Sequence, residues 1–164
     1  MQTLEDLMKF KGIGQAKAVS IAAALELGRR KGKANEKISQ SIRKSRDIYK
    51  HVKDRFEYLG HEEFYAVLLN RSNKVQAIER ISVGGISGTS VDGKVIFKKA
   101  IEQSASGVVL CHNHPSGNLN PSRADIELTK KLVNFGRMIE MPILDHLIIT
   151  DKDYFSFADQ SILT

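Results

Sequence analysis

The sequence predicts an α/β fold, a sheet flanked by helices, preceded by a small helical segment. In the second part of the chain, short apolar runs with strand character alternate with longer segments of helical periodicity. Such alternation is typical of an α/β sandwich. With 164 residues, of which 41% are hydrophobic, the chain can bury one core of ordinary size plus a small appendage.

The first predicted element is a helical hairpin that turns at Gly12 and Gly14. The run from Phe10 to Lys17 reads FKGIGQAK, and its two glycines permit a tight turn between two helical patterns. The second pattern carries apolar residues at helical spacing: Ala18, Val19, Ile21, Ala22, Leu25 and Leu27. Residues 28–35 combine two glycines with a charge run and an asparagine, so we expect a linker there.

A long helix is expected next, over residues 39–58. Its inward-facing side chains are Ile42, Ile48, Val52 and Phe56. Residues 64–69 and 75–83 then predict two paired strands, because the turn-forming run Asn70-Arg-Ser-Asn73 separates two apolar segments.

The remaining elements alternate between helix and strand. Residues 94–104 predict a helix, and the short apolar, β-branched run at 107–112 predicts a central buried strand. Apolar residues at helical spacing predict an amphipathic helix over residues 122–140. A further apolar strand is expected at 143–150, followed by a last short one.

Two histidines and an aspartate stand at metal-ligand spacing where the central strand ends. In a strand, positions i and i+2 point to the same side, so His112 and His114 can converge on one ion. Residues 115–121 are rich in Pro, Gly, Asn and Ser and predict a loop, which places Asp125 in the first turn of the next helix. Two nitrogens and one oxygen leave a fourth tetrahedral position for water, as catalytic zinc requires. We therefore predict one zinc ion.

The run Ser122-Arg-Ala-Asp125 has a second interpretation that needs no metal. It matches a capping box, in which Ser122 caps the helix and the carboxylate reaches back to a backbone N–H group. The two histidines upstream favour the metal site over a cap alone. Cys111 is the only cysteine and points away from the histidines by strand alternation, so we interpret it as a small core residue.

Composition bounds the cellular setting. A single cysteine excludes an intrachain disulfide and agrees with a reducing compartment. No apolar stretch approaches the roughly 18 residues of a membrane span, and Met1 is followed by acidic and mixed residues rather than by a secretion leader. We expect a cytoplasmic protein with no membrane attachment.

The spacing His112-x-His114, seven residues, Ser122, two residues, Asp125 resembles the JAMM motif of the JAB/MPN metalloproteases. The longer strings HNHPSG and PSRAD resemble the bacterial RadC family, of the UPF0758 type, within that group. This resemblance implies an MPN-like mixed-sheet sandwich and a single zinc ion bound by the two histidines and the aspartate.

The resemblance also implies a division of the chain. Residues 36–164 correspond to the JAMM metallohydrolase domain, and residues 9–32 resemble the helix-hairpin-helix segment that precedes it in RadC proteins, which gives a leading segment over residues 1–32. Because RadC proteins usually begin further upstream, we expect a short or truncated member of the family.

The JAMM pattern includes a glutamate directly before a hydrophobic strand. Glu63, followed by the run from Phe64 to Leu69, matches that position, and Glu62 is its neighbour. Successive strand side chains point oppositely, so only one of the two can face the zinc, and adjacency to Phe64 favours Glu63. The resemblance then implies Glu63 as general base toward a water whose pKa zinc lowers to about 7. Ser122 would donate its hydroxyl to the developing oxyanion.

The reaction implied by the resemblance is hydrolysis of a peptide or isopeptide bond in an unknown substrate. Zinc nucleobase deaminases also pair a metal with a glutamate, but their signature is H-x-E followed by P-C-x-x-C. Here position 114 is histidine and the chain has no CxxC, so that alternative is disfavoured. The pair Asp145-His146 belongs to the RadC-like pattern, and a role in orienting a histidine ligand stays open beside a structural one.

Basic charge is concentrated near the predicted hairpin. Residues 1–60 hold 14 Lys/Arg against 7 Asp/Glu. Helix-hairpin-helix elements contact the nucleic-acid backbone without reading sequence. Backbone N–H groups at Gly12 and Gly14, with Lys11 and Lys17, would make such contacts. Alternatively, the glycines only join two packed helices, and the lysines lie on the solvated side.

Two classes of function therefore remain. The first is a zinc hydrolase whose leading segment brings it to DNA or to a partner. The second is a DNA-repair accessory protein that binds DNA through its N-terminal hairpin and cleaves nothing. The complete set of site residues argues for the first class: Glu63, His112, His114, Ser122 and Asp125.

Overall fold

The computed structural model describes residues 4–39, 41–57, 59–84 and 91–163. The chain divides into two compact units, Met1–Ser39 and Gln40–Thr164. Among the described helices, none combines the length and the apolar character needed to cross a membrane.

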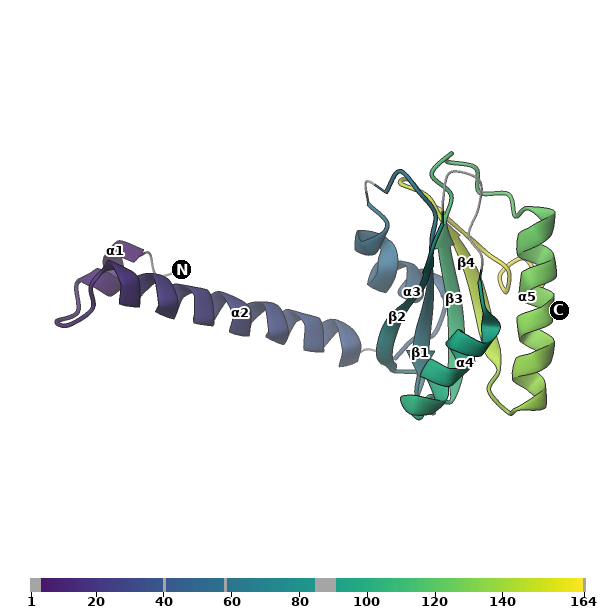
Figure 1. The fold of residues 1–164 in the computed structure, drawn as a ribbon, viewed down its shortest axis with the longest axis horizontal. Coiled ribbons are helices and arrows are strands. Elements are labelled where there is room, and N and C mark those ends of the chain that lie inside the picture. The colour runs from purple at the N-terminus through teal and green to yellow at the C-terminus, as the bar shows by residue number, and fades with distance from the viewer. Residues whose placement is uncertain (1–3, 40, 58, 85–90, 164) are drawn as a thin grey trace. The chain divides into compact units, whose positions relative to one another are not determined.

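The second unit is built on one five-stranded sheet of mixed direction (Figure 1). The strands lie in the order β2-β1-β3-β4-β5. Neighbouring strands are antiparallel except for β3 and β4, which are parallel. Their bounds are β1 Glu63–Leu69, β2 Val75–Val83, β3 Gly107–Asn113, β4 Ile143–Ile149 and β5 Tyr154–Ser156.

The two central strands explain why the sheet is covered on both faces. All seven residues of β1 and all seven of β3 are buried, as expected for continuous apolar runs that have no solvent-facing side. Strand β3 pairs with β1 on one edge and with β4 on the other. In this register Phe64 lies opposite His112, so the end of β3 is held in place by both of its neighbours.

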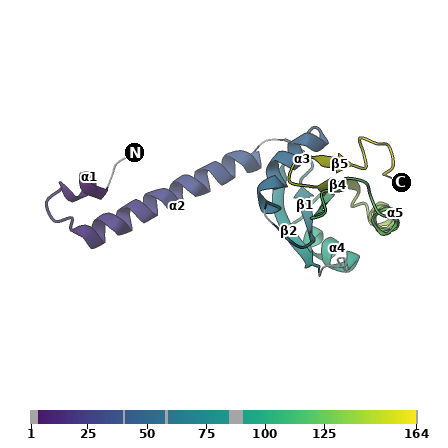
Figure 2. The same ribbon diagram turned by 90° about the horizontal axis from the view of Figure 1, so that it is seen from above.

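Helices cover the two faces of the sheet, with α3 on one side and α4 and α5 on the other (Figure 2). Side chains of α3 (Ser45–Val52) pack against one face together with Tyr65 and Val67. Side chains of α4 (Gly93–Glu102) and α5 (Arg123–Met138) pack against the other face. The structure thus confirms the predicted fold class.

The helix predicted over residues 39–58 is shorter than expected. It begins at Ser45 because the Asp47 carboxylate accepts hydrogen bonds from the backbone N–H groups of Arg43 and Lys44, which closes its N-terminus. A 3-10 turn, η1 (Lys53–Arg55), follows α3. The prediction of its inward face is confirmed, since the four apolar residues are buried: Ile42, Ile48, Val52 and Phe56.

The first unit consists of α1 (Leu4–Met8) and α2 (Gln15–Ser39), joined by a turn in which Gly12 has a φ of 89°. A positive φ of this kind is easily reached by glycine and rarely by other residues. Within the described part of this unit, Leu7 and Ala18 are the buried apolar residues. Several others are exposed: Leu4, Met8, Phe10, Val19, Leu25 and Leu27.

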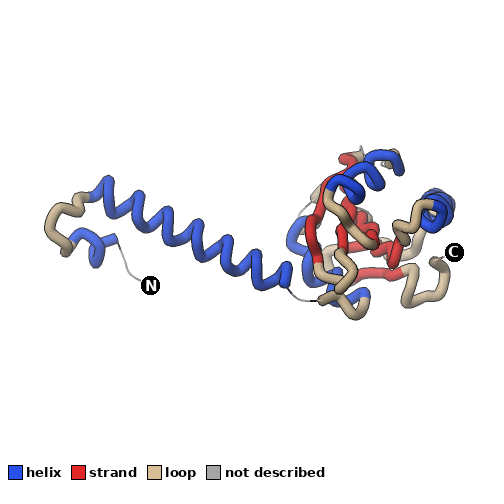
Figure 3. The backbone as a smooth tube through the Cα atoms, turned by 90° about the horizontal axis from the view of Figure 1, so that it is seen from below, coloured by secondary structure: helices blue, strands red, loops and turns tan. Residues whose placement is uncertain are grey.

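The predicted linker at residues 28–35 is wrong, because these residues belong to α2. Figure 3 shows α2 as one unbroken helix through this stretch. Each glycine in a helix costs only about 1 kcal/mol, and the arginines, lysines and alanine of residues 28–35 are good helix formers. The helix therefore continues across residues whose composition resembles that of a loop.

Gly136 lies inside α5, where alanine normally stabilises a helix by about 1 kcal/mol relative to glycine. Here a Cβ atom would stand 2.4 Å from the backbone oxygen of Met141 and 3.4 Å from the ring of Phe97. Since backbone must move to relieve that clash, we expect Gly136→Ala to lower the free energy of unfolding by about 1–3 kcal/mol. Denaturant unfolding measures this change in stability. The control is Gly60→Ala, because a Cβ atom there would meet nothing within 4 Å. Unchanged or increased stability of Gly136→Ala would contradict this packing.

Candidate metal centre

The side chains of His112, His114 and Asp125 converge at the end of β3. The Nε2 atoms of the two histidines lie 3.0 Å apart. The Asp125 carboxylate approaches both of them, with Oδ1 3.3 Å from Nε2 of His112 and Oδ2 3.6 Å from Nε2 of His114. One ligand atom from each residue lies within 4.8 Å of the others, a spacing that suits one shared metal ion. The predicted set of ligands is therefore brought together.

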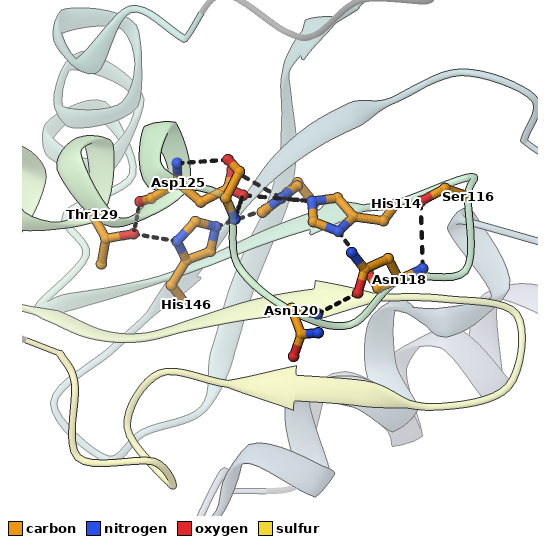
Figure 4. Close-up of polar contacts among 9 residues, drawn as sticks. His114, Ser116, Asn118, Asn120, Asp125, Thr129 and His146 are labelled. Atoms are coloured by element: carbon orange, nitrogen blue, oxygen red, sulfur yellow. Dashed lines mark hydrogen bonds and ion pairs between the residues drawn. The ribbon is translucent and has the colours of Figure 1, made fainter.

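The ring of His114 is oriented by a loop backbone. Its Nδ1 lies 2.6 Å from the carbonyl oxygen of Asn118, and Figure 4 marks this contact with a dashed line. Because a carbonyl only accepts, Nδ1 must donate, which leaves the lone pair of the neutral ring on Nε2. Nε2 is the atom that points at the other two ligands, so His114 presents its lone pair to the metal position.

Asp125 serves as a helix cap and as a candidate ligand at once. The Ser122 hydroxyl oxygen accepts from the backbone N–H of Asp125 at 3.1 Å, and Asp125 Oδ2 accepts from the backbone N–H of Ser122 at 2.7 Å. This is a complete capping box at the start of α5. The box fixes the Asp125 rotamer with Oδ1 toward His112. The two interpretations of this sequence are thus compatible.

His146, which the sequence left without an assigned role, lies directly behind His112. It is fully buried on β4, with Nε2 2.8 Å from Nδ1 of His112 and Nδ1 2.6 Å from the hydroxyl of Thr129. The Thr129 hydroxyl in turn donates to the backbone oxygen of Asp125 at 2.6 Å. Metal-bound histidines commonly have such a partner on their second ring nitrogen.

The electrostatics of the group favour an ionised carboxylate. Burial alone would raise the pKa of Asp125, but its close contacts with the imidazole rings of His112 and His114 outweigh burial and hold that pKa far below its usual range. The same pairing with Asp125 raises the pKa of His114. Burial, together with the nearby charge of His112, lowers the pKa of His146. The group therefore presents a carboxylate beside two imidazoles, which a cation can join by displacing protons.

The structure does not bring Glu63 to this group. Glu63 is 5% exposed, and its carboxylate accepts a hydrogen bond from the Tyr65 hydroxyl at 2.6 Å, with His61 Nε2 at 3.1 Å and Arg80 Nη1 at 3.4 Å. Tyr65 packs in the core on the α3 side of the sheet. Burial by itself would raise the pKa of Glu63, but its hydrogen bonds with Tyr65 and His61 lower that pKa overall. Glu63 is thus a buried, paired carboxylate on the far face.

Glu62 lies on the side of the candidate ligands instead. Phe64 stacks on the His112 ring, with centroids 5.8 Å apart, and residues 62 and 64 share a face by strand alternation. Glu62 lines the same cleft as His112 and His114, and its charge contributes to the raised pKa of His114. The choice of Glu63 rested on adjacency to Phe64. Alternation makes that criterion wrong, because neighbours in a strand face opposite ways.

A cleft of about 840 Å³ opens over the three candidate ligands. Besides Glu62, its walls include Ser122 at the start of α5, the loop residues Asn118 and Asn120, and Leu128 on α5. The three candidate ligands are therefore open to this cleft, and Ser122 lines it while it caps the helix.

The residues predicted to contact nucleic acid lie at the turn of the first unit. Lys11, Gly12, Gly14 and Lys17 are all exposed there. The Lys17 ammonium donates to the backbone oxygen of Gly12 at 3.1 Å, which ties this lysine to the turn. Contact with DNA stays a prediction.

Thr129 and Asn118 are the site residues that the sequence argument missed. Thr129 follows Asp125 by four residues, and positions i and i+4 lie on one face of a helix, so its proximity to Asp125 had a local signal. Asn118 contributes only its backbone oxygen, which any residue type supplies. No pattern of side chains could therefore have identified it.

Comparison with known proteins agrees with this architecture. The family model described as the RadC-like JAB domain matches residues 42–162. A "UPF0758 protein" of Flavobacterium johnsoniae is 49% identical over 160 residues, which cover 98% of this chain and 70% of the relative. A "UPF0758 protein" of Caldanaerobacter subterraneus subsp. tengcongensis is 42% identical, with 94% and 70% covered. One of a Geobacillus species is 40% identical, with 96% and 70% covered.

The printed names of these relatives state no activity. The family model spans nearly all of the second unit, and the relatives match nearly the whole chain at 40% identity or more. The sheet of mixed direction and the cluster of two histidines and one aspartate stand inside the matched region. The chain therefore belongs to the family of RadC-like JAB domain proteins.

Proposed function

We propose that this protein is a zinc-dependent hydrolase of the JAMM type that cleaves a peptide or isopeptide bond. The observation that carries the proposal is the convergence of His112, His114 and Asp125 at the floor of an open cleft. Nε2 of His114 lies 3.0 Å from Nε2 of His112, and its other ring nitrogen is engaged by a backbone oxygen. A ligand set already oriented and yet reachable from solvent is what catalysis at a metal needs.

The donor set suits zinc better than the alternatives. Two imidazole nitrogens and one carboxylate oxygen form a three-ligand catalytic set that leaves one tetrahedral position open. Calcium and magnesium favour sites made of oxygen ligands. A zinc ion held by these residues would lower the pKa of a bound water to about 7 and would polarise a carbonyl oxygen.

Glu62 is the general base in this proposal, in place of Glu63. Its carboxylate lies on the cleft side of β1's leading end, whereas that of Glu63 is engaged with Tyr65 on the other face. Glu62 would accept a proton from the attacking water and pass it to the departing amine. A group must reach the reacting water to do this, and of the two glutamates only Glu62 lines the cleft.

Ser122 would assist at the carbonyl oxygen. Its oxygen accepts from the N–H of Asp125, but a hydroxyl has one donor and two acceptor positions. The proton therefore remains available to a substrate in the cleft that Ser122 lines. A hydrogen bond that strengthens as negative charge develops on that oxygen stabilises the transition state more than the ground state.

We also infer that the exposed turn of the first unit contacts DNA without reading its sequence. Lys11 and the two glycines lie open to solvent there, in the part of the chain with the excess of basic residues. Glycines give a phosphate close access to backbone N–H groups. This contact alone would also serve the second class of function, an accessory protein of DNA repair without cleavage.

Removal of a ligand should abolish stable metal binding. Loss of an outer hydrogen-bond partner typically weakens metal binding by roughly 10–100-fold. Asp125→Ala removes a ligand itself, so we expect it to weaken zinc binding by more than that. Metal analysis after equilibration with a chelator of known affinity measures the change. Glu127→Ala, which removes an exposed carboxylate of the same helix paired with Arg123, is the matched control and should keep its zinc. If Asp125→Ala retained zinc as tightly as the control, the proposed ligand set would be refuted.

Substitution of Glu62 should affect activity, whereas substitution of its neighbour Glu63 should affect stability. In a screen of peptide and isopeptide substrates, we expect Glu62→Gln to keep its zinc and to lower kcat by about 10²–10⁴-fold. Glu63→Gln should keep most of the activity but lose about 1–3 kcal/mol of unfolding free energy, because a charged acceptor of the Tyr65 hydroxyl is removed. The reverse pattern would restore Glu63 as the base.

Binding of a mixed-sequence DNA duplex should depend on salt through the exposed turn. We expect Lys11→Ala to weaken binding and to reduce the slope of log K against log salt by about 0.9, the value for one phosphate contact. Lys98→Ala, an exposed lysine of α4, is the control and should leave the slope unchanged. Equal slopes for wild type and Lys11→Ala would argue against contact at the turn.

A further inference from the structure

We infer that Thr129 and His146 form a hydrogen-bond relay that holds His112 in the one tautomer able to bind the metal. The inference rests on the proposed function, since it concerns a ligand of the same site. Neither residue lines the cleft or has a role in the chemistry proposed above. Both are positioning residues, which act through His112.

The relay runs through three short contacts between four groups. The Thr129 hydroxyl donates to the backbone oxygen of Asp125 at 2.6 Å. The same hydroxyl lies 2.6 Å from Nδ1 of His146, and Nε2 of His146 lies 2.8 Å from Nδ1 of His112. Figure 4 shows Thr129 and His146 joined by a dashed line near Asp125, with further dashed contacts leading on toward His114.

Counting protons gives the relay one direction. Thr129 has a single hydroxyl proton, and a backbone carbonyl can only accept, so this proton is committed to Asp125. Nδ1 of His146 must then be the donor in its contact with Thr129. In an uncharged imidazole the other nitrogen carries the lone pair, so Nε2 of His146 accepts from Nδ1–H of His112. The lone pair of His112 is left on Nε2, which faces Asp125 and His114.

The reverse direction would disable the site. If Thr129 donated to His146, then His146 would donate from Nε2 to His112, and the proton of His112 would stand on Nε2. A protonated Nε2 cannot bind a metal ion. In addition, the backbone oxygen of Asp125 would lose the hydrogen bond that it accepts from Thr129. Thr129 is therefore the residue that selects the productive tautomer.

Packing prevents the His146 ring from rotating to exchange its two nitrogen atoms. The ring is fully buried and stacks on Phe157, with centroids 4.8 Å apart and planes at 16°. Phe64 lies against it as well, with centroids 5.5 Å apart. A buried, uncharged imidazole that rotated would leave polar atoms without partners, which costs about 1–3 kcal/mol for each. The ring orientation is thus held by apolar contacts and its tautomer by Thr129.

The two histidine ligands differ in how their tautomer is set. His114 donates to a backbone oxygen, that of Asn118, an acceptor that no side-chain substitution removes. His112 depends on two side chains in series, and the series starts at the backbone oxygen of Asp125, itself a candidate ligand. The relay thus couples the helix that supplies the carboxylate to the ring of the buried histidine. Side-chain substitutions can therefore change the tautomer of His112 but not remove the acceptor that sets the tautomer of His114.

The tautomer can be read in the metal-free wild-type protein by long-range ¹⁵N–¹H NMR of the imidazole rings. We expect Nδ1 to carry the proton in both His112 and His146. Thr129→Val keeps the side-chain shape and removes the hydroxyl, and we expect a mixed tautomer at His112 and zinc binding about 10–100-fold weaker. Thr129→Ser restores the hydroxyl and should restore both readouts. Thr150→Val, which removes a similar hydroxyl-to-backbone bond at 3.0 Å in a turn, is the matched control.

Either of two results would overturn the relay: a His112 ring whose Nδ1 carries no proton in the wild type, or Thr129→Val with the His112 tautomer and zinc affinity of the wild type. The wild-type spectrum needs no variant, so a Thr129→Val protein that failed to fold would still leave the test decisive. Absence of hydrolysis by a protein with the expected tautomers and tight zinc would refute the proposed function but not the relay. Conversely, normal turnover in Thr129→Val would refute the relay alone.

Discussion

The place of β3 inside the sheet is the constraint on which the site depends. Hydrogen bonds to β1 on one edge and to β4 on the other fix its register. His112 therefore lies opposite Phe64 and beside Ile148, and the parity of the strand fixes which side chains face α5. Because the strand is buried on both faces, a slip by one residue would place apolar and polar side chains on the wrong faces, which strongly disfavours it.

The start of α5 places a carboxylate against the end of this strand. Asp125 closes the capping box with Ser122 and reaches both histidine rings. A residue that caps a helix has a restricted rotamer, so the folding of α5 itself orients the candidate ligand. The helix is in turn held to the sheet by apolar side chains such as Leu132 and Val133. Secondary structure and site geometry are thus determined by the same contacts.

Polar groups are buried on both faces of the sheet, and two of the large ones, His146 and Glu63, have hydrogen-bond partners. On the α5 face, His146 lies between Thr129 and His112. On the α3 face, Glu63 is held by Tyr65 and neighbouring basic side chains. Unpaired groups of this kind would cost several kcal/mol in such a core. The first network contacts the ring of a candidate metal ligand, whereas the second lies at the start of β1.

The sequence by itself determined the α/β fold class, most of the strands and helices, and the three candidate ligands. These depend on local features: apolar periodicity, the i and i+2 parity of His112 and His114, and a loop that leads into a helix start. Tertiary structure alone decided that Glu62 rather than Glu63 faces the cleft, and that His146 stands behind His112. The physical reason is that each of these facts depends on which strands pair and in what register. That pairing is set by contacts between residues far apart in the chain, and no local pattern records it.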